Sequence, residues 1–213
     1  MNLILIGPPG SGKGTQAKYI VDKYNYFQLS TGDLLRNEIK KKSKIGYEIS
    51  LKIDKGHFVD DEIVNTLLKD IIKIKKNRNQ IIFDGYPRNL SQAKNLDLLI
   101  KNDGQTIGSI IFLNLTKENI SKRISGRYTC EKCNTILNEF TDEVKFKTHS
   151  CEKKYLNKRI DDSVETVLKR YDTYMEQTKP VLDYYNTKSN FNEIDGSLKI
   201  DEITRKIDEI LNV

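Results

Sequence analysis

A glycine-rich segment directly after a short apolar run constrains the fold of this chain more than any other feature. The run from Asn2 to Gly7 predicts a buried parallel strand, and a helical pattern begins near Gln16. Glycines let backbone N–H groups converge on phosphate oxygens, and the following helix N-terminus adds its dipole. The segment between them therefore predicts a phosphate-binding loop, with Lys13 as a point charge for the phosphate oxygens. Its residues are Gly7, Pro8, Pro9, Gly10, Ser11, Gly12, Lys13, Gly14 and Thr15.

Short apolar runs and helical periods alternate along the rest of the chain. Ile81 to Asp84 and Ser109 to Asn114 predict buried strands, and Phe191 to Asp195 predicts a weaker one. This alternation predicts an α/β fold with a parallel sheet covered by helices on both faces. The apolar faces of two predicted helices are Ile63, Leu67, Leu68, Ile71 and Ile72, and Ile200, Ile203, Ile207, Ile210 and Leu211.

Length and composition fit one α/β domain with perhaps one insertion, since the chain has 213 residues and is 37% hydrophobic. Leu3 to Ile6 is too short for a signal peptide, and no stretch approaches the roughly 18 apolar residues that cross a bilayer. We expect no membrane association and a cytoplasmic location. The net charge of +6 fits a nucleic acid, an anionic small molecule, or lysine-rich helix ends such as Lys40 to Lys44 and Lys73 to Lys76.

The helical period fails between about Tyr128 and Lys158, which predicts an insertion with its own small fold. All three cysteines lie there, between positions 130 and 151. In a reducing compartment an odd number of clustered cysteines argues against a disulfide framework. A metal site and idle thiols both remain open.

The loop departs in one position from the usual phosphate-loop pattern. Gly14 stands where Ser or Thr normally holds Mg²⁺, and Thr15 follows it. This variant resembles nucleoside monophosphate kinases, most of all adenylate kinases, and the resemblance extends over essentially the whole chain. It implies the P-loop nucleoside monophosphate kinase fold and reversible transfer of the terminal phosphoryl group of Mg-ATP to AMP, giving two ADP. It also implies a single chain with a core (1–29, 60–122 and 160–213), an AMP-binding segment (30–59) and a lid (123–159).

Two blocks resemble the acceptor site of that family. Without the resemblance, Ser30 to Arg36 is a strand end, a helix cap at Thr31 or Asp33 and a charged helix face. Phe83 to Asn89, with Gln92, is more diagnostic. The resemblance also implies that His57 is a surface contact rather than a catalytic base. The residues to which it gives AMP-binding roles are Thr31, Arg36, His57, Phe58, Val59, Gly85, Tyr86, Pro87, Arg88, Gln92, Arg159 and Arg170.

Asp84 ends a predicted strand, so it points to the crevice where open α/β sheets bind ligands and can orient the waters of Mg²⁺. Arg88 offers a planar fork for phosphate, and Gln92 has the donor and acceptor that an adenine edge needs. Arginines from several directions suit phosphoryl transfer, which spreads charge over the equatorial oxygens. The resulting catalytic set is Lys13, Asp84, Arg88, Arg123, Arg159 and Arg170.

The donor site is implied in the same way. The family resemblance places an arginine four residues before Arg123, against the ATP adenine, and here that residue is Asn119. The implied ATP-binding residues are Gly10, Ser11, Gly12, Lys13, Gly14, Thr15, Arg123, Arg127, Ile136, Leu137 and Leu198.

A helix is predicted after Arg159, with its cap at Asp162 or Ser163. Its predicted buried face consists of Val164, Val167, Leu168 and Tyr171.

The insertion resembles the lid of long-form adenylate kinases, which implies a structural Zn²⁺ held by Cys130, Cys133 and Cys151. The fourth ligand is missing, because Lys154 stands at its usual position. His149 is the nearest substitute, followed by Glu152 and Asp142.

Two other functions compete with this interpretation. A UMP or CMP kinase has the same loop, although Thr31, Gln92 and the long lid favour AMP. A nucleic-acid-binding protein would use the basic surface and the cysteine knuckle, but the cysteines lack interleaved aromatic residues. A regulatory P-loop switch fits less well, because of Gly14. We therefore expect ATP, AMP and ADP as partners of a monomer, and no nucleic acid.

Overall fold

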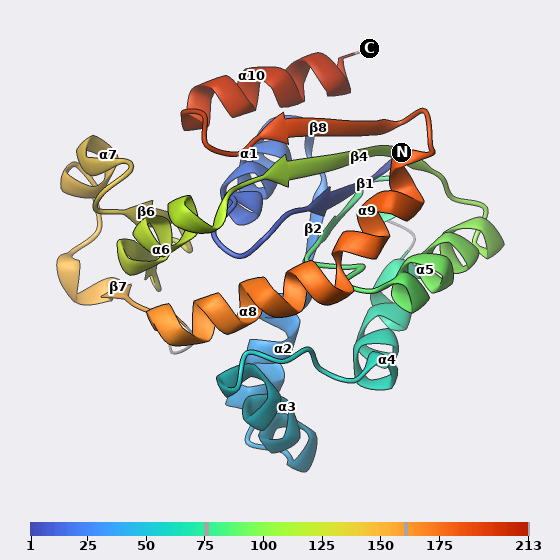
Figure 1. The fold of residues 1–213 in the computed structure, drawn as a ribbon, viewed down its shortest axis with the longest axis horizontal. Helices are drawn as coiled ribbons and strands as arrows, with labels where there is room; N and C mark the ends of the chain where they lie inside the picture. The colour runs from blue at the N-terminus through green and yellow to red at the C-terminus, as the bar shows by residue number, and fades with distance from the viewer. Residues whose placement is uncertain (75–76, 160–161, 213) are drawn as a thin grey trace.

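A five-stranded parallel sheet lies at the centre of the molecule, in the order β2-β3-β1-β4-β8 (Figure 1). The computed structural model describes residues 1–74, 77–159 and 162–212. Each neighbouring pair of strands in this sheet runs parallel, as the alternation of apolar runs and helical periods predicts. The strands are β1 (Asn2–Ile6), β2 (Phe27–Ser30), β3 (Ile81–Asp84), β4 (Ile107–Asn114) and β8 (Phe191–Asp195).

Helices cover both faces of this sheet because its buried strands are apolar on both sides. In β1, Leu3 and Leu5 pack with α1 (Lys13–Tyr24) and α10 (Ile200–Leu211), while Ile4 and Ile6 face the opposite core. That opposite core is completed by α4 (Asp61–Ile72), α5 (Leu90–Asn102) and α9 (Lys179–Asn186). The α/β fold class is confirmed.

The remaining long helices extend from the sheet toward one end of the molecule. α2 (Thr31–Lys40) and α3 (Lys44–Asp54) form a pair at the bottom of Figure 1, and α8 (Val164–Gln177) runs below the sheet in this view, above that pair. A Cβ on Gly46 would lie 2.4 Å from the carbonyl oxygen of Glu38, so glycine is what lets α3 approach α2 so closely. α6 (Lys117–Ser125) packs against α8 through Ile120, Ile124 and Val167.

A second, antiparallel sheet lies at the left of Figure 1 in the order β6-β5-β7. It consists of β5 (Arg127–Cys130), β6 (Ile136–Asn138) and β7 (Leu156–Asn157), and α7 (Glu143–Lys147) and the short 3₁₀ helix η2 (Lys153–Tyr155) complete the unit. Among residues 127–158 only Cys130 and Leu137 are buried hydrophobic residues. A unit with so little core needs other means to keep its shape.

Several predicted boundaries need correction. α1 begins at Lys13 rather than near Gln16, because Gly12, with φ 96°, turns the loop straight into the helix before the first buried position. The cap of α2 is Ser30, not Thr31 or Asp33, since its hydroxyl accepts a hydrogen bond from the Asp33 N–H.

The other predicted elements agree with the structure, apart from the start of one strand and the exposure of one residue. Ser163, one of the two predicted caps, caps α8. β4 begins at Ile107, two residues before the predicted start. Val164 was predicted to be buried but is 49% exposed, because it opens α8 ahead of the turn that meets α6. Lys75, Lys76, Ile160 and Asp161 lie outside the described residues. In the described part of the chain, no helix is long and apolar enough to cross a membrane.

Candidate functional site

One cleft of about 1690 Å³ opens at the carboxyl ends of the central strands. The phosphate loop forms its floor, the segment after β3 and the helix α2 form one wall, and the second sheet forms the other. The predicted site residues that line it are Gly10, Ser11, Gly12, Lys13, Gly14, Thr15, Arg36, Phe58, Asp84, Gly85, Pro87, Arg88, Arg123, Arg127, Ile136, Leu137, Arg159, Arg170 and Leu198.

The phosphate loop is shaped by backbone conformations that favour glycine. Gly10 and Gly12 have φ values of 79° and 96°, in the region that other residues rarely adopt. The Ser11 N–H donates to the Pro8 carbonyl at 3.2 Å, which closes the turn. The first turn of α1 therefore directs its free N–H groups into the cleft, an arrangement that binds anions.

Lys13 lies folded against the loop. Its Nζ donates to the carbonyl oxygens of Gly7, at 2.7 Å, and Pro8, at 3.0 Å. Burial lowers the pKa of Lys13 to about 8; Asp84 opposes this shift, and the positive charges of Arg88, Arg170 and Arg127 add to it. Since cations outnumber carboxylates around this ammonium, the site favours a bound anion.

Asp84 is the carboxylate at the floor of the cleft. It ends β3 and is 8% exposed, and its Oδ2 accepts a hydrogen bond from Gln28 Nε2 at 2.9 Å. Burial raises the pKa of Asp84, while Lys13 and the Gln28 hydrogen bond act in the opposite direction. Both partners thus help to keep this carboxylate ionised.

The arginines divide into groups along the cleft. Burial lowers the pKa of Arg159 to about 10, and the charges of Arg127 and Arg36 act in the same direction. Burial also lowers the pKa of Arg123, where the opposing charge is Asp195, at the end of β8. Arg123 and Leu198 both line the cleft, and Asp195 is close enough to act on the guanidinium of Arg123.

Two arginines are held by well-defined partners. Arg127 makes a two-pronged ion pair with Asp162, whose side chain is only 2% exposed. Arg88 Nε donates to the Gly85 carbonyl at 2.8 Å, and its guanidinium lies 5.1 Å from the centre of the Phe58 ring. The planar group of Arg88 is thereby oriented before any ligand arrives.

Five predicted acceptor residues do not line the cleft: Thr31, His57, Val59, Tyr86 and Gln92. His57 is exposed and Val59 is part of the core. Thr31 Oγ1 donates to the Gly85 carbonyl at 2.7 Å. Gln92 Oε1 accepts from the Arg88 N–H at 2.7 Å, and its Nε2 donates to Asp61 Oδ1 at 2.6 Å. The side chains of Thr31 and Gln92 are therefore hydrogen-bonded to other parts of the protein in this conformation.

Gln28 and Lys18 line the cleft although sequence reasoning missed both. Gln28 lies on β2, an edge strand with partly exposed residues that gave no apolar run to recognise. Its alternation with Leu29, which is buried, was the available signal. Lys18 is four residues after Gly14, and helical spacing alone would have placed the two on one face.

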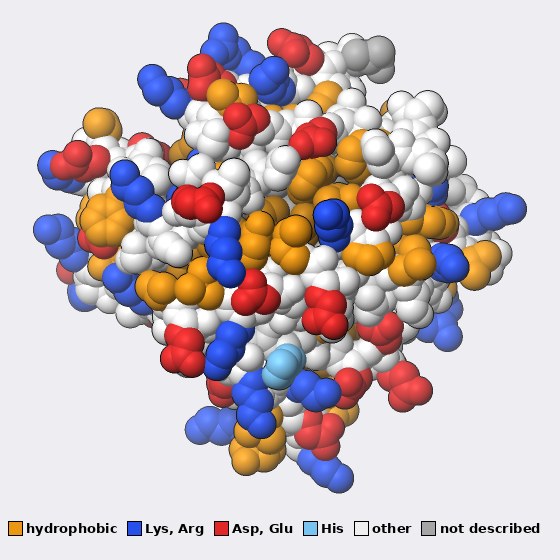
Figure 2. Space-filling model, viewed as in Figure 1, with side chains coloured by type: hydrophobic (Ala, Val, Ile, Leu, Met, Phe, Trp, Pro, Cys, Tyr) orange, Lys and Arg blue, Asp and Glu red, His pale blue; other side chains and the backbone are white. Residues whose placement is uncertain are grey.

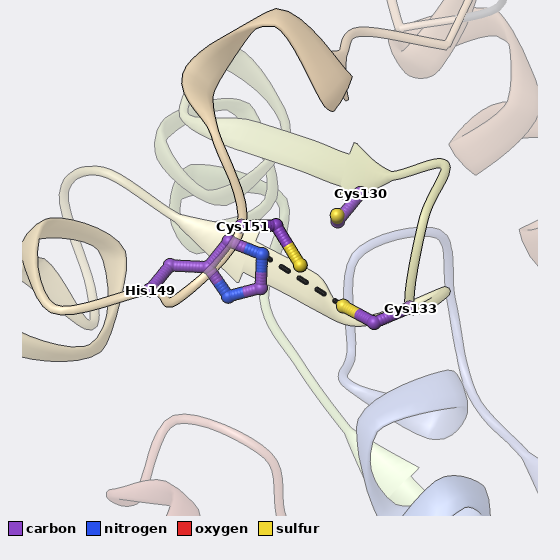
Figure 3. Close-up of side chains that lie close together, drawn as sticks. All are labelled: Cys130, Cys133, His149 and Cys151. Atoms are coloured by element: carbon purple, nitrogen blue, oxygen red, sulfur yellow. Dashed lines mark hydrogen bonds between the residues drawn. The ribbon is translucent and has the colours of Figure 1, made fainter.

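The three cysteines come together in the second sheet, with His149 beside them (Figure 3). One potential ligand atom from each of Cys130, Cys133, His149 and Cys151 lies within 4.8 Å of the other three, and Cys133 Sγ is 3.7 Å from His149 Nε2. Tetrahedral Zn²⁺ holds such atoms roughly 3.5 to 3.8 Å apart. Hydrogen bonding with Thr135 lowers the pKa of Cys133 to about 7, toward the thiolate form that binds metal.

The other two candidates for the fourth ligand are used elsewhere. Glu152 forms an ion pair with Lys154 at 2.9 Å, and Asp142 caps α7 by accepting from the Lys145 N–H. The geometry therefore favours His149 as the fourth member of the set.

Comparison with known proteins gives one consistent relationship. A model of the family described as adenylate kinase matches residues 5–190. The adenylate kinase of Pelagibacter ubique is 57% identical over 213 residues, which is all of both chains. The adenylate kinase of Fusobacterium nucleatum is 44% identical over 99% of this chain and 98% of its own, and that of Archaeoglobus fulgidus is 38% identical over the same shares.

Proposed function

This chain belongs to the adenylate kinase family, and we propose which of its residues carry the reaction of that family. It is a phosphotransferase that moves the terminal phosphoryl group of Mg-ATP to AMP, gives two ADP and runs in both directions. The observation that supports our assignment of roles is the crowding of Arg88, Arg127 and Arg170 around Lys13, with Asp84 as the opposing charge. Such a site is suited to several phosphate charges at once.

At the donor end, the loop from Gly10 to Thr15 would hold the ATP phosphates through its N–H groups. Lys13 would exchange the loop carbonyls for the β- and γ-oxygens, because a phosphate is the stronger acceptor. Mg²⁺ neutralises charge on the transferring group when bound, and Asp84 would orient its waters. Gln28 holds the Asp84 carboxylate in place for that role.

For the donor adenine we assign Arg123 rather than any residue at position 119. Arg123 and Leu198 line the cleft, as Asn119 does, and Asp195 acts on the arginine. Arg123 can therefore stack on the base while Leu198 offers its backbone carbonyl.

At the acceptor end, Arg36, Arg88, Arg159 and Arg170 would bind the AMP phosphate. Arg36 is now paired with Asp33, and an anionic phosphate would compete for it. Phe58 and Gly85 line the cleft where the base would enter. Contact with Thr31 and Gln92 would need them to exchange their present partners, Gly85 and Asp61, for the adenine edge.

The transfer itself needs no general base, since the AMP phosphate is already an anion. Catalysis would rest on alignment of the two phosphates and on neutralisation of the charge that spreads over the equatorial oxygens. We assign residues 123–159 as a lid that closes over this site and excludes water, residues 30–59 as the AMP-binding segment, and the other residues as the core.

We propose that the lid holds a structural Zn²⁺ on Cys130, Cys133, Cys151 and His149. The cluster is compact, and the unit around it has little hydrophobic core. The metal would fix the tip of the β5–β6 hairpin and take no part in phosphoryl transfer.

We also propose that the enzyme acts as a monomer without a nucleic acid partner. Basic and acidic side chains are interspersed on the face drawn in Figure 2, whereas a nucleic acid surface concentrates basic ones. Most lysines then belong to the solvated surface, and the cations that line the cleft bind nucleotide phosphates.

The first prediction tests the assigned phosphate contacts. Lys13→Ala and Arg88→Ala should each lower kcat by about 10² or more, because both groups stabilise charge in the transition state. Turnover is measured with saturating Mg-ATP and AMP, and thermal unfolding is recorded beside it. The exposed Lys101→Ala on α5 is the control and should keep normal turnover. Near-normal turnover of either site variant would contradict the roles.

The second prediction concerns pH. Lys13 binds phosphate only when protonated, and its pKa is lowered to about 8 in the free enzyme. The value of kcat/KM for ATP should therefore be level below pH 8 and fall by about tenfold per unit well above it. Lys13→Arg stays charged across this range and should lose the alkaline decline, whatever its absolute rate. An unchanged decline in that variant would assign the titration to another group.

The third prediction concerns the acceptor base. Diphosphate formed from Mg-ATP with AMP, CMP or UMP should show a preference for AMP of at least about a hundredfold in kcat/KM. Gln92→Leu and Thr31→Val keep side-chain size but remove the polar edge, so each should raise KM for AMP without changing KM for ATP. Equal use of the three monophosphates would contradict these roles, and a preference for CMP or UMP would favour a pyrimidine-type kinase instead.

The fourth prediction concerns the metal. Protein purified without chelator or polyhistidine tag should contain about one Zn²⁺ per chain by elemental analysis. Cys130→Ser and His149→Ala should lose it and lower the melting temperature of the lid, while kinase activity remains measurable because the core folds separately. Glu152→Ala is the matched control and should keep the metal. Unmodified protein without zinc would mean that packing alone holds the lid.

A further inference from the structure

The tip of the β5–β6 hairpin touches α1 at two points. Lys18 Nζ donates to the backbone carbonyl of Cys133 at 3.3 Å. One turn earlier on the same helix, Ile136 lies against Gly14, so that a Cβ on Gly14 would be only 3.0 Å from Ile136 Cδ1. Residues four apart share a helix face, and the two contacts therefore form one surface.

Backbone conformation does not explain why glycine stands at position 14. Its φ is not positive, unlike those of Gly10 and Gly12 in the same loop. It lies in the first turn of α1, where glycine costs up to about 1 kcal/mol relative to alanine. The close approach of Ile136 supplies the reason, since the absence of a side chain leaves room for the hairpin.

The Cys133 carbonyl is presented to Lys18 by a tight turn. Asn134, with φ 55°, adopts the left-handed conformation, and its N–H donates to the Cys130 carbonyl at 2.8 Å. The Cys130 N–H in turn donates to the Thr135 carbonyl at 2.9 Å. The acceptor thus has a fixed position, and the hydrogen bond that it accepts comes from a charged ammonium, which makes that bond stronger than one between neutral groups.

We propose that Gly14 and Lys18 form a seat on α1 that receives the hairpin tip and positions the lid over the donor nucleotide. This inference rests on the proposed function of residues 123–159 as a lid. Lys18 is a positioning residue, because it acts through the Cys133 carbonyl rather than through the substrate. The seat lies on α1, whose N-terminus would bind the ATP phosphates. The same helix would therefore position both the lid and the phosphates.

The first test removes the charged donor. Lys18→Met should raise KM for ATP about fivefold, the factor expected for one lost hydrogen bond, with KM for AMP and the melting temperature unchanged. Its kcat should not fall, because opening becomes easier. Lys18→Arg, which keeps a charged donor, should recover most of the affinity, and Lys101→Met should match the unmodified enzyme. Equal KM values for Lys18→Met and Lys101→Met would overturn the seat.

The second test uses rescue between the two contact partners. Gly14→Ala should raise KM for ATP, because the new Cβ meets Ile136 Cδ1. Ile136→Val lacks that atom, so the double variant Gly14→Ala with Ile136→Val should recover most of the loss. If the alanine instead blocks the ATP phosphates, valine will give no recovery, and the seat is wrong. The variants test only the seat. The proposed function itself would be refuted if the unmodified chain formed no ADP from ATP and AMP.

Discussion

The crowding of positive charge around Lys13 is the physical constraint on which the rest of the site depends. An ammonium that is partly withdrawn from water and feels the charges of Arg88, Arg127 and Arg170 is costly to keep protonated, and its lowered pKa reflects that cost. Asp84 and the loop carbonyls compensate only in part. A polyanionic ligand supplies the missing negative charge, so ligand binding stabilises an arrangement that the empty protein holds at some expense.

The central sheet brings these groups together through strand register. Leu5 of β1 lies opposite Asp84 of β3, and Ser30 of β2 lies on the other side of Asp84. The loop after β1, the Asp84 carboxylate and the cap of α2 therefore meet at one edge of the sheet. Because parallel strands end together, each following segment begins at the same cleft. The segment after β3 and the phosphate loop are thus neighbours although residues 16–84 separate them in the sequence.

Sequence reasoning predicted the features that depend on local pattern. The loop, β3 and the apolar faces of α4 and α10 follow from periodicity and glycine placement, and they lie close to where they were expected. It predicted only the end of β2, at Ser30, because an edge strand has no continuous apolar run, and it therefore missed Gln28. The orientation of Gln92 was also hidden, since Asp61 competes for its amide and is distant in sequence. Spacing alone could not choose among His149, Glu152 and Asp142, because loop geometry decides which side chain turns toward the cysteines.

The small core of residues 127–158 would give the proposed zinc site and the proposed seat complementary roles. Cys130 and Leu137 are the buried hydrophobic residues among 127–158, too few to hold three short strands by packing. A metal would fix the hairpin internally, yet it would leave the position of the lid relative to the core undetermined. The contacts with Gly14 and Lys18 supply that position. One hydrogen bond contributes only about 1 kcal/mol net, so a lid docked in this way would still be able to open in each catalytic cycle. A large apolar interface would hold the lid more firmly and would slow the release of product.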